Sequence, residues 1–442
     1  MKKITNILIT INILFLLGCV VYYGGRMYKY YRLENPKLED IETLYDMVTR
    51  GKNITTKNDG LYKENNSFYY KGKKVNNYLM YSGRLWRIVS IDETGLMKLI
   101  TDDSQTSLVW GVENNYEDSY IRSWLNNEEN NIKSFYESLD NKEIITTTKT
   151  CYDELNDKNV TCEKFVTDNV GTLSVYEYEK AGSSQSYLNI GSYWWTSNSD
   201  KNKNAWYVYS KGTINNEVNS GKTYFSYGVR PVITINSKIE NFEGEGTKEN
   251  PYLIKFEQGN NLNDKYVGEY FKFNDINFKI LEKNDEYVKL VTADLIKENE
   301  NLVLKKYGNT NYFNLDEGIG YYLNNIFYNT LPDKTNILKG NFNVGRYDKS
   351  YKYDFNMISE YQEQAYVGLL QLGELFINDC ENYLLMSRTI TSDKTIYQVT
   401  EAGKIFAGTL ESEKYVRPTL YVKPNIKIVK GDGSLKNPWV GE

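Results

Sequence analysis

The sequence predicts an α+β protein with mostly antiparallel sheets, built from two diverged copies of one domain behind a membrane helix and a short stalk helix. Three observations lead to this prediction: a charge-free apolar segment near the N-terminus, motifs that recur at one fixed distance, and strands interspersed with short helices. The chain has 442 residues, too many for one ordinary core. We expect an anchor in 1–26, a stalk helix and linker in 35–65, and repeats in 66–257 and 262–442.

The anchor is predicted from residues 4–23, which contain no charged side chain and follow Lys2 and Lys3. At about 1.5 Å per residue, a helix of this length matches a hydrocarbon core about 30 Å thick. The alternative is a lipoprotein signal, because the run from Phe15 to Cys19 resembles the bacterial lipobox, in which the cysteine is lipidated. Basic residues follow the segment, but long domains cross a membrane largely regardless of charge, so we expect the domains outside the cell.

A short stalk helix is predicted after the anchor. Asn35-Pro36 is typical of a helix start and Gly51 of a helix end. The apolar residues between them recur at three- and four-residue steps, at Leu38, Ile41, Leu44, Tyr45 and Val48. About four turns are too short for an independent coiled coil, so we expect the helix to pack on the first repeat. Residues 52–66 are expected to form a linker.

The duplication is predicted from three motif pairs that share one sequence offset. A Val-Arg-Pro motif occurs at 229–231 and again at 416–418. A Gly-acid-Gly motif occurs at 244–246 and 431–433, and an Asn-Pro-aromatic motif occurs at 250–252 and 437–439. Upstream, with small insertions, the correspondence continues at Leu125-Asn126 with Leu323-Asn324, and at Val170-Gly171 with Val367-Gly368. A period this long indicates duplicated globular domains rather than a solenoid.

Each copy is expected to open with two strands, continue with short helices and close with aromatic-rich strands. In the first copy these are strands 85–91 and 96–100, helices 119–125, 132–139 and 174–181, and strands 193–196, 205–209 and 228–235. The Gly-acid-Gly motif is interpreted as a turn whose glycines take positive φ, because too few carboxylates are regularly spaced for a calcium loop.

Part of the first copy carries a family pattern: Trp194-Trp195, then Trp206-Tyr207-Val208, Gly212, and Gly228 to Pro231. This pattern resembles a bacterial family of domains of unknown function with a C-type-lectin-like core, distantly similar to formylglycine-generating enzymes. The resemblance implies two tandem C-type-lectin-like domains, of which the second is degenerate because Tyr383 to Met386 replace the tryptophan pair. The paired cysteines of the oxidase branch and the Glu-Pro-Asn and Trp-Asn-Asp motifs of calcium-dependent lectins are absent from the expected places.

The candidate site residues are few. Four aromatic residues form either a binding surface or part of the hydrophobic core: Trp194, Trp195, Trp206 and Tyr207. Arg230 and its counterpart Arg417 are capable of binding a carboxylate or phosphate, but their presence in both copies favours a structural role.

Cys151 and Cys162 flank a polar loop, and we expect a structural disulfide, which requires export from the cytoplasm. Cys380 lies in an apolar stretch and is expected to be buried.

Composition narrows the function. The chain has no histidine, which removes the Ser-His-Asp and Cys-His nucleophile systems and His-ligated zinc. The net charge of −5 argues against a nucleic-acid partner. We expect no cofactor and no metal.

The predicted function is a non-catalytic ligand-binding or adhesion module at the cell surface, with a cell-wall glycan or a surface protein as partner. A carboxylate-based glycan-acting enzyme, using acids such as Asp102-Asp103 or Glu117-Asp118, and a structural subunit of a cell-envelope assembly are the alternatives. The ligand site, if present, is expected in the first copy.

Overall fold

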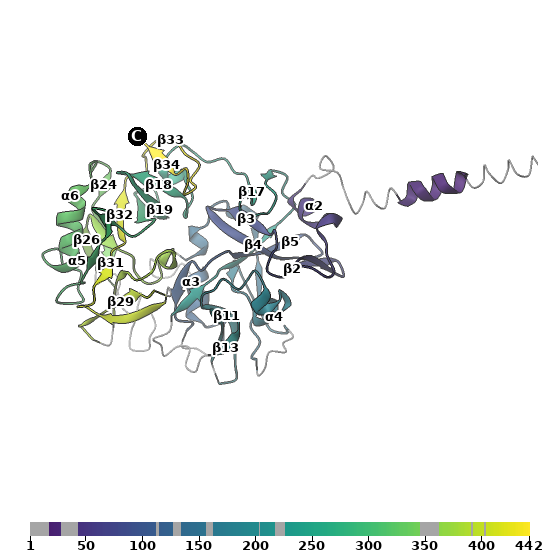
Figure 1. Ribbon diagram of the computed structural model, residues 1–442, viewed down its shortest axis with the longest axis horizontal. Helices are drawn as coiled ribbons and strands as arrows, with labels where there is room; N and C mark the ends of the chain where they lie inside the picture. Colours follow the sequence, from purple (N-terminus) through teal and green to yellow (C-terminus); the bar gives the residue numbers. More distant parts are fainter. Residues whose placement is uncertain are drawn as a thin grey trace, which may run out of the picture.

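The computed structural model describes residues 17–27, 43–111, 115–126, 134–155, 162–202, 204–216, 226–344, 362–389, 392–401 and 404–442. We call residues 43–257 the first half and 258–442 the second half (Figure 1). Most of the predicted anchor lies outside the described residues, of which residues 17–27 form a helix. Among the helices of the described ranges, none is long and apolar enough to cross a membrane.

The predicted stalk helix is shorter than expected. Helix α2 spans Leu44–Thr49, and its N-cap is Thr43, which has extended backbone angles and forms a capping box with Asp46. A continuous helix from Asn35-Pro36 is therefore wrong, although those two residues lie outside the described ranges. Gly51 does not take positive φ; it opens the 3₁₀ turn Gly51–Asn53. The buried face of α2 packs on the first half, because the amide of Leu44 donates to the carbonyl of Ile239 at 2.8 Å.

The linker prediction for residues 52–66 is also wrong in part, because residues 60–64 form a strand of the larger sheet of the first half. This sheet contains ten described strands. Its main path runs through β10 (Val170–Gly171), β15 (Val232–Asn236), β5 (Leu96–Thr101), β4 (Arg84–Ile91), β3 (Tyr78–Tyr81), β17 (Tyr252–Ile254) and β16 (Phe242–Glu243), with β1 (Gly60–Glu64), β2 (Ser67–Lys71) and β7 (Ile145–Thr146) off this path.

The larger sheet of the second half runs through its strands in the same order. It contains β24 (Ile337–Leu338), β32 (Pro418–Val422), β20 (Val288–Thr292), β19 (Ile276–Lys283), β18 (Tyr270–Phe273), β34 (Trp439–Gly441) and β33 (Ile428–Lys430), with β27 (Val367–Leu369) beside β32. The pairing of β4 with β5 and that of β19 with β20 each contain a bulge, at Ile88/Ser90 and at Ile280/Glu282. In each sheet a strand near the end of the half pairs in parallel with an early strand. Strand β17 pairs with β3 in the first half, and β34 pairs with β18 in the second.

Each half adds a smaller sheet. In the first half it consists of β13 (Ile214–Asn216), β12 (Ala205–Val208), β11 (Trp194–Ser199), β14 (Tyr227–Val229) and β6 (Thr106–Leu108); in the second, of β28 (Leu384–Arg388), β29 (Thr395–Val399) and β30 (Ile405–Thr409). The single strand predicted for residues 228–235 is wrong, because Arg230-Pro231 separates β14 from β15 and the chain passes there from one sheet to the other.

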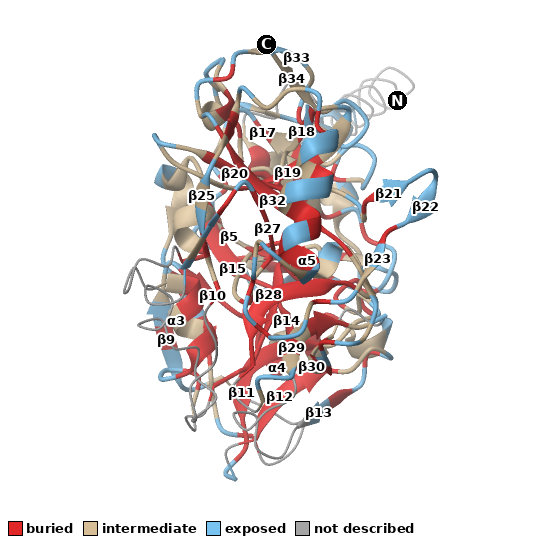
Figure 2. Ribbon diagram, turned by 90° about the vertical axis from the view of Figure 1, so that its left-hand side faces the viewer, coloured by how far each residue is buried: buried red, intermediate tan, exposed pale blue. Residues whose placement is uncertain are grey.

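Short helices cover the sheets. They are α3 (Tyr120–Asn126) and α4 (Val175–Lys180) in the first half, and α5 (Gly318–Tyr321), the π-helix η8 (Tyr322–Phe327) and α6 (Tyr328–Thr330) in the second. The predicted helix 174–181 is confirmed as α4, with Ser174 as its N-cap. The predicted helix 132–139 is reduced, in its described part, to the 3₁₀ turn Tyr136–Ser138. Figure 2 shows buried strands through the middle of the molecule, and exposed residues in the connections and on one face of the helical segment 318–330. The predicted α+β class is confirmed.

The two halves are in close contact. Gly83 lies against the second half so closely that a Cβ atom there would be 2.6 Å from the carbonyl oxygen of Val267. The indole of Trp124 donates to the carbonyl of Gly373 at 2.7 Å, and the hydroxyl of Tyr266 donates to the side chain of Asn141 at 2.8 Å. These contacts fix one half against the other.

Candidate functional site at the cleft between the halves

The four aromatic residues predicted as binding surface or core are buried. Trp194 and Trp195 are 0% and 1% exposed, and Trp206 and Tyr207 are 8% and 3% exposed. The indole N–H of Trp195 donates to the carbonyl of Leu108 at 2.8 Å within the core. Because no large part of these rings reaches solvent, they form core rather than a binding surface.

The two arginines have equivalent surroundings. The Nε of Arg230 donates to the carbonyl of Thr101 at 3.0 Å, and the Nε of Arg417 donates to that of Thr292 at 3.0 Å. A second main-chain carbonyl accepts from Nη1 in each case, that of Leu188 at 2.9 Å for Arg230. Burial lowers the pKa of Arg230 to about 10. With both guanidinium groups buried and bonded to backbone, neither is exposed to bind an anion from solvent.

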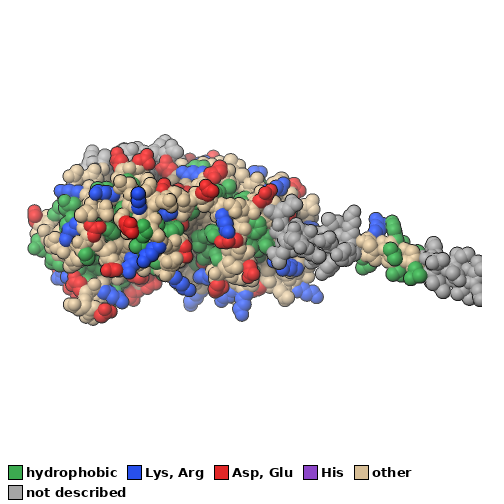
Figure 3. Space-filling model, turned by 90° about the horizontal axis from the view of Figure 1, so that it is seen from above, with side chains coloured by type: hydrophobic (Ala, Val, Ile, Leu, Met, Phe, Trp, Pro, Cys, Tyr) green, Lys and Arg blue, Asp and Glu red, His purple; other side chains and the backbone are tan. Residues whose placement is uncertain are grey.

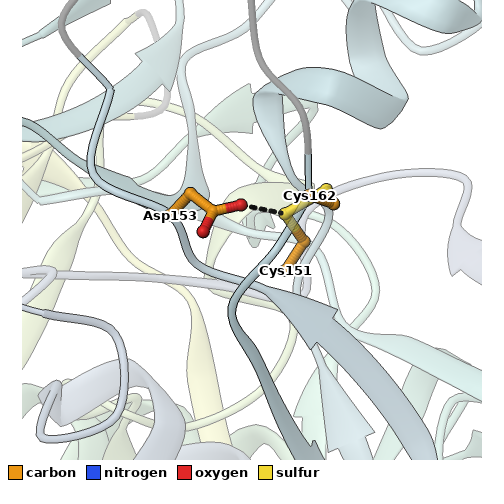
Figure 4. A group of neighbouring side chains, drawn as sticks. All are labelled: Cys151, Asp153 and Cys162. Atoms are coloured by element: carbon orange, nitrogen blue, oxygen red, sulfur yellow. Dashed lines mark hydrogen bonds between the residues drawn. A yellow bond between two sulfur atoms is a disulfide. The ribbon is translucent and has the colours of Figure 1, made fainter.

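The predicted disulfide is confirmed between Cys151 and Cys162, whose Cα atoms are 5.6 Å apart (Figure 4). Asp153 lies beside it, and the three residues form the kind of cluster that holds a metal. The two sulfurs are bonded to each other and offer no thiolate ligand. The carboxylate of Asp153 instead accepts from the amides of Glu163 and Lys164 at 2.7 and 2.8 Å, and so fixes the return of the loop. Cys380 is only partly buried, and burial raises the pKa of its thiol.

A cleft with a volume of about 590 Å³ lies between the halves. The first half contributes α3 and the turn after it, through Tyr120, Trp124, Phe135, Glu137 and Asp140. The second half contributes the end of β19, the turn that follows it, the β24–β25 region and the segment around Glu374, through Leu281, Glu282, Lys283, Glu286, Tyr287, Lys289, Asn341, Gln371, Glu374 and Tyr421. Strand β25 is Gly340–Asn343. The cleft therefore joins residues that are far apart in the sequence.

An ion pair lies at the base of this cleft. The ammonium group of Lys289, whose side chain is 4% exposed, contacts the carboxylate of Glu374, which is 10% exposed. Burial alone would lower the pKa of Lys289, but the carboxylates of Glu374 and Glu282 outweigh it, and the pKa of Lys289 lies above its ordinary value. Nearer the opening, Lys283 pairs with Asp140 across the halves at 2.8 Å. The hydroxyl of Tyr287 donates to Glu282 at 2.6 Å.

The first half offers an internal comparison for this ion pair. Lys98 on β5 pairs with Glu177 of α4 at 2.6 Å, and Lys98 has the same register in its sheet as Lys289. Lys98 lies opposite Ser90 and Thr234, whereas Lys289 lies opposite Glu282 and Tyr421. The ion pair is thus common to both halves, while the surrounding acid and aromatic ring are particular to the second half.

The sequence did not single out the cleft. Its lining residues belong to no contiguous motif, and most of them come from the second half, whereas the tryptophans directed attention to the first. One signal was available: the register of the two halves places Glu282 where the first half has Ser90. Such a difference at equivalent positions marks residues that the fold itself does not require.

The surface around the halves carries both signs of charge. Figure 3 shows Lys and Arg side chains interspersed with Asp and Glu side chains over the face seen from above. No extended basic area of the kind that binds nucleic acid appears on that face.

In comparisons with known proteins, one family model matches part of the first half. No match was found among curated proteins or among solved structures. The predicted resemblance to a domain-of-unknown-function family is confirmed to this extent: residues 94–237, from just before β5 to the end of β15, match the family described as Domain of unknown function (DUF6273).

Proposed function

We propose that this protein is a non-catalytic binding protein, anchored in a membrane through residues 4–23 and displayed outside the cell, whose ligand site is the cleft between its halves. We further propose that the halves are diverged copies of one C-type-lectin-like domain. The observation that carries the proposal is the cleft itself, which is lined from both halves and differs in its side chains from the equivalent place in the first half.

The duplication is supported by more than strand order. The side-chain amide of Asn126 donates to the carbonyl of Val170 at 2.8 Å and accepts from its amide at 3.0 Å. Asn324 makes the same two bonds with Val367, at 2.9 and 3.1 Å. Together with the equivalent arginines, these pairs hold corresponding strands at corresponding positions. Such agreement in side-chain detail is the result expected of two copies of one fold.

The properties of the cleft suit a binding site. Its volume lies within the range of about 300–1,000 Å³ that is typical of ligand sites. Aromatic rings, amide side chains and charged groups line it together. A binding site between copies also accounts for the close contact of the halves, because both walls must keep one geometry for a ligand to touch both.

An enzymatic reading is less well supported. A carboxylate mechanism needs two acids that are free to exchange protons across the cleft. Glu374 is held by Lys289, and the equivalent pair in the first half shows that the fold uses this arrangement structurally. We therefore do not assign catalysis to the cleft.

The proposal is tested with the full chain in detergent, incubated with cell-wall polymers, a glycan panel and surface-protein extracts. Asn341 is exposed at the cleft, and its side chain makes none of the hydrogen bonds described for the fold. Asn341→Trp places an indole in the cleft and should abolish retention of the ligand. Asn58→Trp makes the same exchange at an exposed residue in a loop of the first half and should leave retention unchanged. Equal retention by both variants would refute the assignment of the site to the cleft.

A further inference from the structure

The halves meet through two different surfaces, one from each half. The first half contributes the turn Ser82-Gly83 between β3 and β4, and the second half contributes Tyr266 and Val267, which precede β18. A Cβ atom on Gly83 would lie 2.6 Å from the carbonyl oxygen of Val267 and 2.8 Å from the Cβ atom of Tyr266. A contact between unlike surfaces of two corresponding domains can be repeated, because it leaves one surface of each domain unused.

The second half carries the counterpart of the turn in the first half. Two-residue turns join β3 to β4 and β18 to β19, at Ser82-Gly83 and Asn274-Asp275, and all four residues have positive φ. The side chain of the first residue in each turn accepts a hydrogen bond at 2.7 Å from the amide of an aspartate, Asp140 or Asp333. Asp275 therefore stands where the first half has Gly83, and its side chain is 92% exposed.

The first half carries the counterpart of the segment in the second half. Tyr78 and Tyr270 open β3 and β18, and the amide of each donates to the second glycine of a closing turn, at 2.9 and 2.8 Å. Counting back from these tyrosines places Lys74-Val75 at the position of Tyr266-Val267. Both valines are buried, whereas Lys74 is exposed.

From these two correspondences we propose that the protein assembles head to tail, with the turn Asn274-Asp275 of one chain bound to the segment Lys74-Val75 of a second copy. The two surfaces are the counterparts of those by which the halves meet within one chain, taken from the opposite halves. Contacts of this kind close into a ring or continue as a filament. The inference goes beyond the proposed function, because it concerns neither the cleft nor its ligand.

The side chains at the two positions differ in a complementary way. Within one chain, Gly83 faces Tyr266 so closely that residue 83 has no room for a side chain. Between chains the same two positions hold Asp275 and Lys74, whose charges are opposite. Asp275 excludes the close backbone approach that Gly83 allows, and an ion pair holds the surfaces instead. On its own chain Asp275 pairs with Lys272 at 3.2 Å, but a pair this exposed is weak and readily exchanged.

Apolar residues lie beside Asp275. It lines one hollow of the second half together with Ile276 and Leu302, and Leu302 is 39% exposed. Leu302 belongs to the hairpin of β21 (Lys297–Glu298) and β22 (Asn301–Leu302), which Figure 2 shows exposed at the edge of the molecule. A stable interface combines an apolar centre with charged groups at its rim, and this face offers both.

Reversal of the two charges tests the proposal by sedimentation velocity of the full chain in detergent at low salt, over a range of concentrations. Asp275→Lys and Lys74→Asp each bring like charges together, and each should weaken association at least about fivefold. The double variant Asp275→Lys/Lys74→Asp restores an opposite pair and should associate like the parent, as should an equal mixture of the two single variants.

Asp285→Lys is the matched control, because Asp285 is an exposed aspartate beyond the other end of β19. It should leave association unchanged. Equal weakening by Asp275→Lys and Asp285→Lys, or a double variant that associates no better than the single variants, would overturn the proposal.

Cysteine variants test the direction of the contact. An oxidised mixture of Lys74→Cys and Asp275→Cys chains should give a disulfide-linked dimer on a non-reducing gel, because the two positions face each other between chains. A mixture of Lys74→Cys and Asp285→Cys chains should not. Lys74→Cys chains that cross-link alone as well as in the mixture would show a contact of like with like and would overturn the head-to-tail order.

Other occupants of the face give different results. A parent chain that is monomeric at every concentration would overturn the proposal. If Asp275→Lys then lowers the Tm of that monomer, the face is covered by another segment of the same chain. If it instead abolishes retention of a protein from a surface extract, the face binds a separate partner. Retention of a ligand in the cleft, tested by Asn341→Trp, is independent of all these outcomes.

Discussion

Replacing Lys289 by methionine tests how the second half is stabilised. The substitution keeps the length of the side chain but leaves the carboxylate of Glu374 buried without its cation. Removing one partner of a buried ion pair typically costs about 3–5 kcal/mol, most of it the desolvation of the charge that remains. Lys98→Met removes the equivalent cation in the first half, where the side chains of Lys98 and Glu177 are 19% and 17% exposed. Water screens this pair better, and we expect a loss of about 1–2 kcal/mol.

The pH dependence of the loss distinguishes this mechanism from simple loss of packing. Burial already raises the pKa of Glu374 in the parent, and the loss of the Lys289 cation, which lowers it, should move this pKa further above the unfolded value of about 4.3. A group with a raised folded pKa stabilises the fold fully below its unfolded pKa and ceases to do so as the pH rises through the folded pKa. The variant should therefore be closest to the parent near pH 4 and should fall behind as the pH rises toward 8. In the parent the raised pKa of Lys289 confers a stabilisation that is lost only as the solution becomes strongly alkaline.

Thermal unfolding, followed by circular dichroism between pH 4 and pH 8.5, measures this difference. For a domain of this size about 1 kcal/mol corresponds to a shift of about 2–4 °C in Tm, so Lys289→Met should melt at least about 6 °C below the parent at pH 8. The double variant Lys289→Met/Glu374→Leu removes the buried charge as well and should recover much of the loss. Equal losses for Lys289→Met and Lys98→Met, with no change between pH 4 and pH 8.5, would refute the reasoning.

Two further predictions concern the first half. Reduction of the bond between Cys151 and Cys162, or its removal by Cys151→Ser, opens a loop of about twelve residues and should lower the free energy of unfolding by about 3 kcal/mol, measured by urea titration with and without reductant. If the titration curves coincide, the bond does not stabilise the fold. Arg230→Lys keeps the positive charge but loses the several N–H donors that bond the carbonyls of Thr101 and Leu188. The free energy of unfolding should fall by about 2–4 kcal/mol in the same urea titration. An unchanged midpoint would show that a single ammonium group is sufficient at this position.

Local signals in the sequence predicted local structure well. Helix α4 begins at the capping box of Ser174, because the bonds that define such a start involve neighbours three residues apart. The paired glycines of the closing turns take positive φ at Gly244, Gly246, Gly431 and Gly433, as the turn motif predicted. Both features depend on short-range geometry, which the sequence records directly.

Features that depend on tertiary contacts were predicted less well. The run from Gly228 to Ile235 has the pattern of a single strand. The buried guanidinium of Arg230 instead donates to the carbonyl of Thr101, which is distant in the sequence, and the chain changes sheets there. The start at Asn35-Pro36 followed the strongest capping signal, whereas the helix begins where Thr43 caps it and the amides of Leu44 and Tyr45 reach the residues after β15. In both cases a contact with a distant segment decided the structure.

The candidate site was the least predictable part. Its walls come from Phe135, Glu282, Glu374 and Tyr421, which no local periodicity connects. The tryptophans that attracted attention are large apolar residues, and burial of such residues is the usual way to form a core. The strand register of the two halves distinguishes the residues that both halves share, such as Lys98 and Lys289, from those found in one half only, such as Glu282.

The parallel pairing of β17 with β3 and of β34 with β18 has a consequence for synthesis on the ribosome. Each sheet has an early strand whose outer edge receives its neighbour only after more than 150 further residues have been made, because Leu79 meets Tyr252 and Phe271 meets Trp439. The first sheet can close while the second is still being translated. Until residue 439 emerges, β18 exposes a strand edge that is open to wrong pairing with another chain.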